Sequence, residues 1–444
     1  MTVRQLRYRE IFFLWLPLAL SGEMMSIAGP VVQAGISRLP EPTINLAAFG
    51  FVMSIAVLVE APVIMLVTAS VALVRNRESY VLLRRFVIHL SLLVTGVGFV
   101  LYFTPLYHFV FQRLMAIPPD VLQVARPALQ VLLLWPMAIA VRRFFQGILI
   151  WQGKSMLVTI GTICRLAALA LTVVVGVSIR SVSGALVGGL AMAISVMIEM
   201  FVAAWWARPL IREKVLPVSA NPDSNFVKGY AGLFHFYWPL AGTDIMRIAA
   251  RPIATTGIAR MPNPMLSLAA WPVASGFVQL LASMTTSLQE VTLARLSDEK
   301  SKRRLAIFAL GTGVVLTSLL VLVSFTGVAS LYFESLMAVP ADVQALAIPA
   351  TGILALMPLL FAGRNFLRGV MIWRRQTGSV QLAMFVNLLT LFVFLALGAW
   401  FGGLVGVIVA AWATVGAQFL ETVSLSWLNR RLEKALGVES ADRS

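Results

Sequence analysis

The sequence predicts an all-α membrane protein of twelve transmembrane helices, arranged as two six-helix bundles that repeat each other in parallel. Three observations predict this class. Of the 444 residues, 59% are hydrophobic and only 12% are charged, whereas about 25% are charged in soluble domains. The apolar residues form runs long enough to cross a bilayer, which takes about 20 residues. The motifs of the first half of the chain also recur, in the same order, in the second half. A soluble single-core protein and a disordered one are excluded.

Twelve hydrophobic runs, separated by charges or by Pro/Gly turns, are the predicted spans. They lie near residues 11–36, 45–74, 84–110, 122–149, 156–178, 183–207, 231–258, 266–294, 304–333, 343–371, 378–400 and 403–428. The first run is too long for a cleavable signal peptide and lacks a small-residue cleavage site, so we interpret it as the first span. An even number of spans places both termini on one side of the membrane.

The charges of the loops predict which side this is. One set of loops carries most of the 35 Lys and Arg residues, while the alternate set carries little more than Arg38, Arg113, Arg180 and Arg260. Positively charged loops face the cytoplasm. We therefore expect both termini to be cytoplasmic, in the plasma (inner) membrane. The net charge of +16 then reflects orientation, and the predicted partners are the lipid bilayer and a small-molecule substrate, with no nucleic acid.

The internal repeat, with an offset of half the chain, is the strongest signal in the sequence. LPLALSGEMM at Leu16 matches WPLAGTDIMR at Trp238, and GISRLPEPTINLAA at Gly35 matches GIARMPNPMLSLAA at Gly257. Because each half has six spans, an even number, the halves share one topology, as in parallel-repeat transporters with a site between the halves. We expect an N-lobe with spans 1–6 at residues 1–207, a cytoplasmic linker at 208–229, a C-lobe with spans 7–12 at 230–428, and a cytoplasmic tail at 429–444.

Motifs for metal binding or catalysis are not found in the sequence. A single cysteine, Cys164, excludes an intrachain disulfide and a cysteine metal cluster. The segment GILIWQGKS at 147–155 resembles a phosphate loop, but it has five residues between its glycines instead of four. HExxH, CxxC and GxSxG are absent from the sequence. We predict no metal site, no bound cofactor and no enzymatic activity.

Polar residues inside spans cost about 2.5–3.5 kcal/mol at the helix centre, so each needs an explanation. Those that occur in both halves are interpreted as architectural: Arg165 and Glu199 in spans 5 and 6, and Asn387 and Glu421 in spans 11 and 12. We predict that Arg165 pairs with Glu199 and that Asn387 hydrogen-bonds Glu421. A proton relay is the alternative.

Two further sets of residues occur at equivalent positions of both halves. Arg142 and Arg364, at the ends of spans 4 and 10, are interpreted as snorkelling anchors at the cytoplasmic face. Proline pairs are interpreted as helix kinks that shape a cavity or a hinge. The pairs are 17/239, 127/349 and 136/358.

Polar residues that occur in one half only are the candidate site. Asp244, Arg247 and Arg251 share one face of span 7, whereas their counterparts in span 1 carry no charge. Spans 1, 2 and 8 add polar side chains at middle depth. The predicted substrate-binding residues are Arg247, Arg251 and Gln279, and the predicted ion-coupling residues are Glu23, Glu60 and Asp244. The alternative is a structural Asp244–Arg247 pair, with Glu23 or Glu60 neutralising Arg251.

Short motifs resemble a known family. Pro17 and Pro239, the G-I-x-R turn and the L-A-A opening of span 2 are similar to the MATE-like branch of the MOP flippase superfamily. The segment 257–270, with Gly-Ile-Ala followed by Leu-Ala-Ala, is similar to progressive-ankylosis (ANK)-type transporters. The resemblance implies a V-shaped carrier with two lobes that exports organic solutes with H⁺ or Na⁺ coupling. It also implies coupling through acidic residues of spans 1, 7 or 8, where this chain has Glu23 and Asp244.

The sequence thus predicts a monomeric secondary active transporter that exports a small organic solute by alternating access. The span-7 arginines favour an anionic solute, because guanidinium groups bind oxyanions through charge-assisted, often bidentate bonds. A carboxylate nearby would then carry the coupling proton. The alternatives are a flippase for an anionic lipid-linked intermediate and an H⁺- or Na⁺-coupled multidrug cation antiporter.

Overall fold

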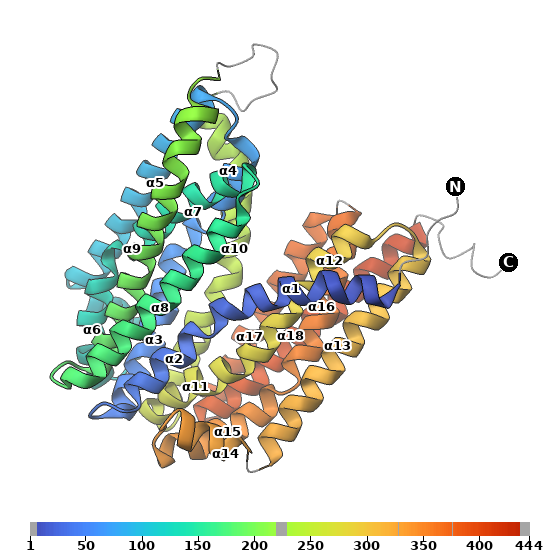
Figure 1. Cartoon of the computed structure of the whole chain (residues 1–444). Coiled ribbons are helices and arrows are strands. Elements are labelled where there is room, and N and C mark those ends of the chain that lie inside the picture. Colours follow the sequence, from blue (N-terminus) through green and yellow to red (C-terminus); the bar gives the residue numbers. More distant parts are fainter. Residues whose placement is uncertain (1–6, 219–228, 327, 375, 436–444) are drawn as a thin grey trace. The chain divides into compact units, whose positions relative to one another are not determined.

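In the computed structural model, which describes residues 7–218, 229–326, 328–374 and 376–435, every regular element is a helix (Figure 1). The predicted all-α class is confirmed. The chain forms two compact units. Unit 1 comprises residues 1–30 and 260–444, and unit 2 comprises residues 31–259.

Unit 2 contains the helices that follow α2 (Ala28–Ile36), whose first residues still belong to unit 1. Its elements are α3 (Pro42–Glu60), η1 (Ala61–Val63), α4 (Leu66–Leu73), α5 (Arg77–Phe103), η2 (His108–Leu114), α6 (Pro119–Val131), η3 (Leu132–Leu134), α7 (Trp135–Trp151), α8 (Ser155–Ile179), α9 (Gly184–Leu210), η4 (Ile211–Val215) and α10 (Gly229–Ala259).

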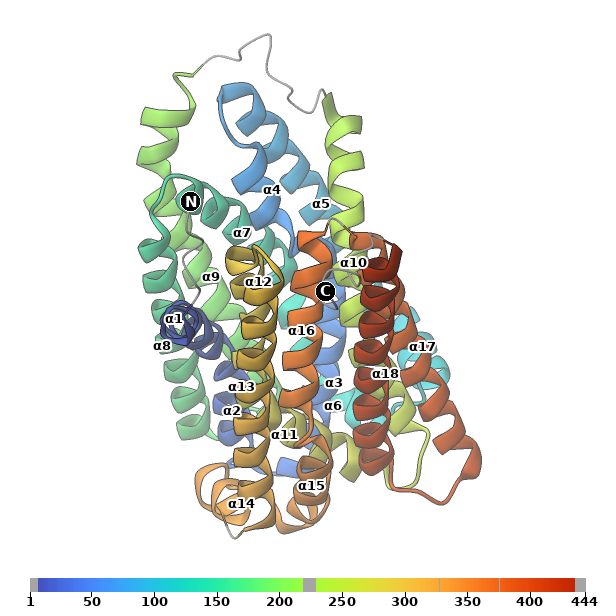
Figure 2. The same cartoon turned by 90° about the vertical axis from the view of Figure 1, so that its right-hand side faces the viewer.

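Unit 1 contains the first helix of the chain and the helices that follow α10. Its elements are α1 (Tyr8–Ser26), α11 (Pro264–Ala282), η5 (Ser283–Thr285), α12 (Leu288–Arg295), α13 (Glu299–Phe325), α14 (Val328–Leu331), η6 (Tyr332–Leu336), α15 (Ala341–Leu354), α16 (Met357–Trp373), α17 (Thr377–Phe401) and α18 (Gly406–Ala435). Figure 2 shows α13, α16, α17 and α18 of this unit from a direction at right angles to Figure 1.

Ten helical segments of the described residues are long and apolar enough to cross a membrane. They coincide with predicted spans 2–6 and 8–12, while α1 with α2 covers span 1 and α10 covers span 7. The predicted linker at 208–229 begins inside the last turn of α9, and its residues 219–228 lie outside the described ranges. In the predicted tail at 429–444, α18 continues to Ala435 and the remaining residues are likewise not described.

The repeat is visible in the local structure as well as in the sequence. Asn76 begins α5 with a capping box, in which its side chain accepts from Ser79 N at 2.9 Å. Asp298, the equivalent residue of the second half, begins α13 in the same way through Ser301. Such caps satisfy backbone N–H groups that the first turn leaves free. The equal caps indicate that both halves start these spans at equivalent residues.

Breaks in the helices also recur in both halves. The second span of each half is interrupted by a short 3₁₀ turn, η1 in unit 2 and η5 in unit 1. Of the predicted proline kinks, Pro136 and Pro358 lie in the first turn of α7 and α16, after the 3₁₀ turn η3 and after a turn at 355–356, respectively. Pro127 and Pro349 lie inside α6 and α15. Prolines fit the first turn because they have no N–H to leave unpaired. The remaining pair, at 17 and 239, lies within α1 and α10.

The first helix of each half packs on helices of the other half. Within unit 1, α1 lies against η5, α11, α12 and α13 of the second half, and Figure 1 shows this dark-blue helix beside them. Within unit 2, α10 lies against η1, α3 and α5 of the first half. The packing buries Ile11, Trp15 and Ala19 in one core with Leu288 and Leu305. The compact units therefore group α1 with the helices of the second half and α10 with those of the first, which we call an exchange of first helices.

An aromatic side chain with a hydrogen-bond donor anchors each exchanged helix. In unit 1, Trp15 Nε1 donates to Met284 O, in the break η5, at 3.1 Å. In unit 2, Tyr237 Oη donates to Pro62 O, in the break η1, at 2.6 Å. Each anchor also packs edge-on against a phenylalanine: the ring centroids are 5.8 Å apart for Trp15 and Phe308 and 5.1 Å apart for Tyr237 and Phe86. The two donors occupy equivalent positions of the repeat, and so do the two acceptors. We refer to these equivalent contacts as the aromatic anchors.

Candidate functional site

Glu199, on α9, is the centre of a buried polar cluster in unit 2. It is 1% exposed and forms an ion pair with Arg142 of α7 through Oε2. Gln146 Nε2 donates to Oε1 at 3.0 Å, and Thr162 Oγ1 donates to the same oxygen at 3.2 Å. Arg165 of α8 is further away, with Nη1 3.9 Å from Oε2. Three helices are thereby joined through one carboxylate.

Glu421, on α18, is the centre of the equivalent cluster in unit 1. Arg368 of α16 pairs with its Oε1, and Asn387 of α17 donates from Nδ2 to its Oε2 at 3.0 Å. Gln418 Nε2 donates to Oε2 at 3.4 Å, and Arg364 Nη1 lies 3.9 Å from it. The arginine that pairs with the carboxylate is Arg142 in unit 2 and Arg368 in unit 1. Because Arg368 is equivalent to Gln146, the pairing arginine lies one helical turn later in unit 1.

The interpretation of Arg142 as a snorkelling anchor is wrong, because its side chain is buried and ion-paired to Glu199. Arg364 points inward too, donating to Gln418 Oε1 at 3.0 Å. Each of these arginines ends a hydrophobic run. The last helix of the same half, α9 for Arg142 and α18 for Arg364, extends beyond the arginine and supplies its acceptor. Gln146 and Arg368 were not predicted; their position four residues after an arginine, on the same helical face, is the signal that identifies them.

Unit 2 carries two further charged groups beside the Glu199 cluster. Glu60, the last residue of α3, is 8% exposed, and its Oε2 has no hydrogen-bond partner within the described residues. The charges that act on Glu60 are those of Arg142, Arg143, Arg251 and Arg165. Arg143 was not predicted as a site residue. The sequence does contain a signal for it, because the equivalent residue of the second half, Asn365, is neutral.

The predicted face of span 7 lies on α10. Arg247 Nε donates to Asp244 Oδ1 at 3.0 Å, so the side chains that the alternative interpretation paired are in contact. Asp244 is buried, whereas the side chain of Arg247 is 51% exposed. Arg251, one turn further on, is exposed, and Arg247 and Glu60 are the groups whose charges act on it. Among the described residues, no carboxylate oxygen lies within 4.0 Å of Arg251.

Four of the six predicted site residues belong to the same unit. Glu60, Asp244, Arg247 and Arg251 all belong to unit 2. Gln279, which is exposed on α11, and Glu23, in α1, belong to unit 1. The side chain of Glu23 lies outside the described part of the structure. Over the described ranges, no group of three or more His, Cys, Asp and Glu residues is placed to hold a metal ion.

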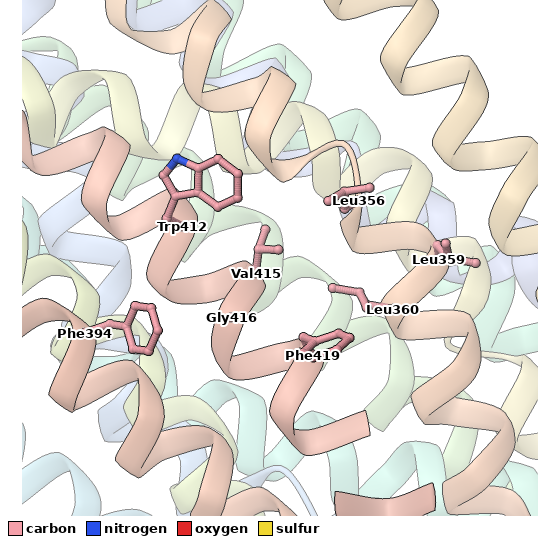
Figure 3. A pocket seen from close by; sticks show the side chains of 8 residues that line it. All are labelled: Leu356, Leu359, Leu360, Phe394, Trp412, Val415, Gly416 and Phe419. Carbon is pink, nitrogen blue, oxygen red and sulfur yellow. The ribbon is translucent and has the colours of Figure 1, made fainter. Parts of the chain in front are cut away.

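An apolar groove of about 380 Å³ lies on unit 1, where α16 and α18 are side by side (Figures 2 and 3). Its lining residues are Leu356, Leu359, Leu360, Phe394, Trp412, Val415, Gly416 and Phe419. The side chains that Figure 3 labels offer the groove rings and aliphatic groups, and the one polar atom among them is the indole nitrogen of Trp412. The groove therefore has the chemistry of a surface in contact with acyl chains, and it differs from the arginine-rich interior of unit 2.

The fold defined by these helices is similar to that of solved membrane transporters of the MOP superfamily. The chain is similar to a solved structure of a multidrug resistance MATE family transporter in an inward-facing conformation, with a TM-score of 0.66 and 13% sequence identity over 99% of this chain and 98% of that one. It is also similar to lipid II flippase MurJ in an inward closed conformation, with a TM-score of 0.71 and 13% identity over 93% of this chain and 87% of that one.

A third similar structure is that of a MOP superfamily transporter from Pyrococcus furiosus, with a TM-score of 0.60 and 12% identity over 95% of each chain. No family model matches the chain, and no match is found among curated proteins. At these identities the likeness establishes the fold. The predicted MATE-like fold agrees with this likeness, while membership of the MATE-like branch and the resemblance to ANK-type transporters stay predictions.

Proposed function

We propose that the chain is a secondary active transporter that exports a small organic anion by alternating access. The observation that carries the proposal is the charge of the interior of unit 2. Three arginines there, Arg142, Arg143 and Arg165, with the exposed Arg251 beside them, face only two glutamates, Glu60 and Glu199. Buried charges without counterions are costly in a membrane protein and mark a pathway or a binding site.

Arg247 and Arg251 are the arginines that a solute meets first, because both are exposed on α10. Gln279 is the polar residue that we propose for unit 1. Glu60 and Asp244, with Glu23, are the proposed carriers of a coupling proton or of Na⁺, since each is an acidic group within a span. Arg165, Glu199, Asn387 and Glu421 are proposed to brace adjacent helices. We further propose that the protein is a monomer of the plasma membrane with both termini in the cytoplasm.

A flippase for an anionic lipid-linked intermediate is the second candidate. It is favoured by the similarity to lipid II flippase MurJ and by the apolar groove on unit 1, which has the chemistry to accommodate an acyl chain. A multidrug cation antiporter is less favoured, because an excess of arginines repels cations. The Pyrococcus furiosus transporter is described as having a binding pocket of reverse polarity that suggests a different function. In this chain the excess of arginines in unit 2 favours an anion.

Uptake by reconstituted vesicles tests the proposal. Vesicles containing the purified protein are supplied with citrate, pyrophosphate or a lipophilic drug cation, with and without imposed H⁺ and Na⁺ gradients. We expect gradient-dependent uptake of an anion, and a loss of that uptake in Arg247→Ala and Arg251→Ala. Undiminished anion uptake by both variants contradicts the assignment of these arginines, and uptake of the cation alone supports the antiporter.

A further inference from the structure

The duplicated architecture supplies an internal comparison for the buried charges of unit 2. Where unit 2 has Glu60, Arg143 and Arg165, the second half has the neutral residues Ala282, Asn365 and Asn387. Both asparagines are hydrogen-bonded, Asn365 Nδ2 to Thr285 O at 3.0 Å and Asn387 Nδ2 to Glu421 Oε2 at 3.0 Å. Neutral side chains thus satisfy these positions of the fold. The equivalent helices of the second half therefore pack without these three charges, so a bracing role of Arg165 does not by itself require a charged side chain.

The same charges leave polar atoms unpaired in unit 2. The Nε atoms of Arg142, Arg143 and Arg165 and the Oε2 atom of Glu60 are buried and, within the part of the chain that the structure describes, lack hydrogen-bond partners. Arg142 and Arg165 are 3% and 6% exposed. A buried charged donor without an acceptor is strongly unfavourable. A ligand that presents several oxygen acceptors would satisfy these donors together.

The ligand must be small, anionic and able to enter. Arg142 is already neutralised by Glu199, and Glu60 offsets one of the remaining three arginines, so about two positive charges are left uncompensated. Arg251 is exposed and Arg143 is partly exposed, so the arginines extend from the surface of unit 2 into its interior. Guanidinium groups match the geometry of oxyanions bidentately. A divalent oxyanion therefore fits the charge and the donors.

We propose that unit 2 contains a binding site for a small divalent oxyanion, either phosphate-type or a dicarboxylate, with Arg143, Arg165 and Arg251 as its ligands. The inference rests on the proposed function for its role in transport, and it places recognition of the substrate within one unit. In the free protein the Glu60 carboxylate interacts electrostatically with these arginines and compensates part of their charge. The incoming anion then competes with Glu60 for the same guanidinium groups.

Binding is tested on the purified full-length protein in detergent, by thermal unfolding and by calorimetric titration at constant ionic strength. The probes are inorganic phosphate, sulfate and succinate, with chloride as the monovalent control. We expect at least one divalent anion to raise the melting temperature and to bind, while chloride does neither. Binding of phosphate and sulfate alone identifies a phosphate-type site, and binding of succinate alone identifies a dicarboxylate site. Equal effects of chloride and all divalent anions would overturn the proposal.

Variants that copy the second half separate binding from folding. Arg143→Asn introduces the residue found at the equivalent Asn365, and we expect it to weaken binding about 10- to 100-fold, the range for one charged hydrogen bond. Arg143→Lys, which keeps the charge and loses the fork of donors, should weaken binding less. Arg84→Asn, which removes an exposed arginine of α5, is the matched control and should bind normally. Wild-type affinity in Arg143→Asn contradicts the assignment.

Glu60→Ala should change the affinity for the anion in the direction opposite to Arg143→Asn. It copies Ala282 of the second half and removes the carboxylate that competes with the ligand, so we expect binding about 10-fold tighter. A residue that only supports the packing would not raise affinity when truncated. Weaker or unchanged binding in folded Glu60→Ala contradicts the competition between Glu60 and the anion.

Transport of the same probe in vesicles distinguishes the inference from the proposed function. Binding that is lost in Arg143→Asn, in a protein that carries no anion across vesicles, supports the site and contradicts the proposed function. Anion transport that persists at wild-type rate in Arg143→Asn and Arg165→Asn supports the function and contradicts the site. Arg84→Asn is measured in both assays as the control and should bind and transport like the wild type.

Discussion

The aromatic anchor of unit 2 provides a stability prediction that the structure defines closely. Tyr237→Phe keeps the ring and its edge-on packing against α5 while removing the hydroxyl. That hydroxyl is buried and donates to Pro62 O at 2.6 Å. Pro62 lies in the break η1, where the regular helical hydrogen bonds are interrupted, so its carbonyl depends on a donor from outside its own helix. The substitution therefore deletes one hydrogen bond and leaves a partly buried acceptor unpaired.

The expected cost follows from the partial burial of that acceptor. An unsatisfied buried polar group costs about 1–3 kcal/mol, and this range is the upper limit for a partly buried one. In a unit of roughly 150–250 residues, 1 kcal/mol corresponds to a change of about 2–4 °C in melting temperature, so Tyr237→Phe should lower it by about 2–12 °C. Melting of the purified protein in detergent, followed by intrinsic tryptophan fluorescence, measures this shift.

Tyr230→Phe is the matched control for this experiment. It makes the same chemical change on the same helix, but Tyr230 is 41% exposed and its hydroxyl meets His89 at the surface, 3.1 Å from Nδ1. We expect it to change the melting temperature little, because an exposed partner is replaced by water or lipid headgroups. Equal melting temperatures of Tyr237→Phe and the wild type, or an equal loss in Tyr230→Phe, would refute the reasoning.

Three further predictions concern other features of the fold. Glu199→Gln removes the counterion of two buried arginines and should destabilise the protein by about 3–5 kcal/mol, measured as lost thermal stability in detergent. Gly147→Ala places a Cβ 2.4 Å from a side-chain carbon of α4 and should cost about 1–3 kcal/mol, whereas Gly96→Ala, with no atom within 4 Å, should cost little. Hydrogen bonds from Ser301 lower the pKa of Asp298, so its contribution to stability is present above the ordinary pKa of an aspartate and is lost as the pH falls through the lowered value. Asp298→Asn, which keeps the cap, should remove that acid-side loss in a pH series of melting curves.

The amino-acid sequence carries enough information to predict the spans and their repetition. Apolar runs are decisive in a membrane protein, because each must satisfy its own backbone by forming a helix. The offset of half the chain between the repeats aligns Glu199 with Glu421 and Arg165 with Asn387. In the structure, Arg165 and Asn387 are found beside these two carboxylates. Periodicity and duplication therefore locate buried polar clusters well.

Other parts of the site were not accessible from the sequence, for physical reasons. Arg142 ends a hydrophobic run, and its burial depends on how far the neighbouring α9 extends past it, which is a tertiary property. The exchange of α1 and α10 was also not predicted, because apolar periodicity identifies a buried face without identifying the helix that covers it. The sequence does contain one signal for it: Trp15 and Tyr237 are equivalent aromatic residues with donors, and buried donors of this kind require a fixed partner.

The exchange of first helices has a consequence for how the chain is synthesised. Helix α1 emerges from the ribosome first, yet the helices that it packs against begin at Pro264. At about 5–20 residues per second, α1 waits for tens of seconds in the membrane before its binding surface is made. If the chain were cut between the halves, the two pieces would form a domain-swapped dimer. Neither piece alone contains a complete core, so we expect each to be unstable when expressed separately and both to be recovered when they are expressed together.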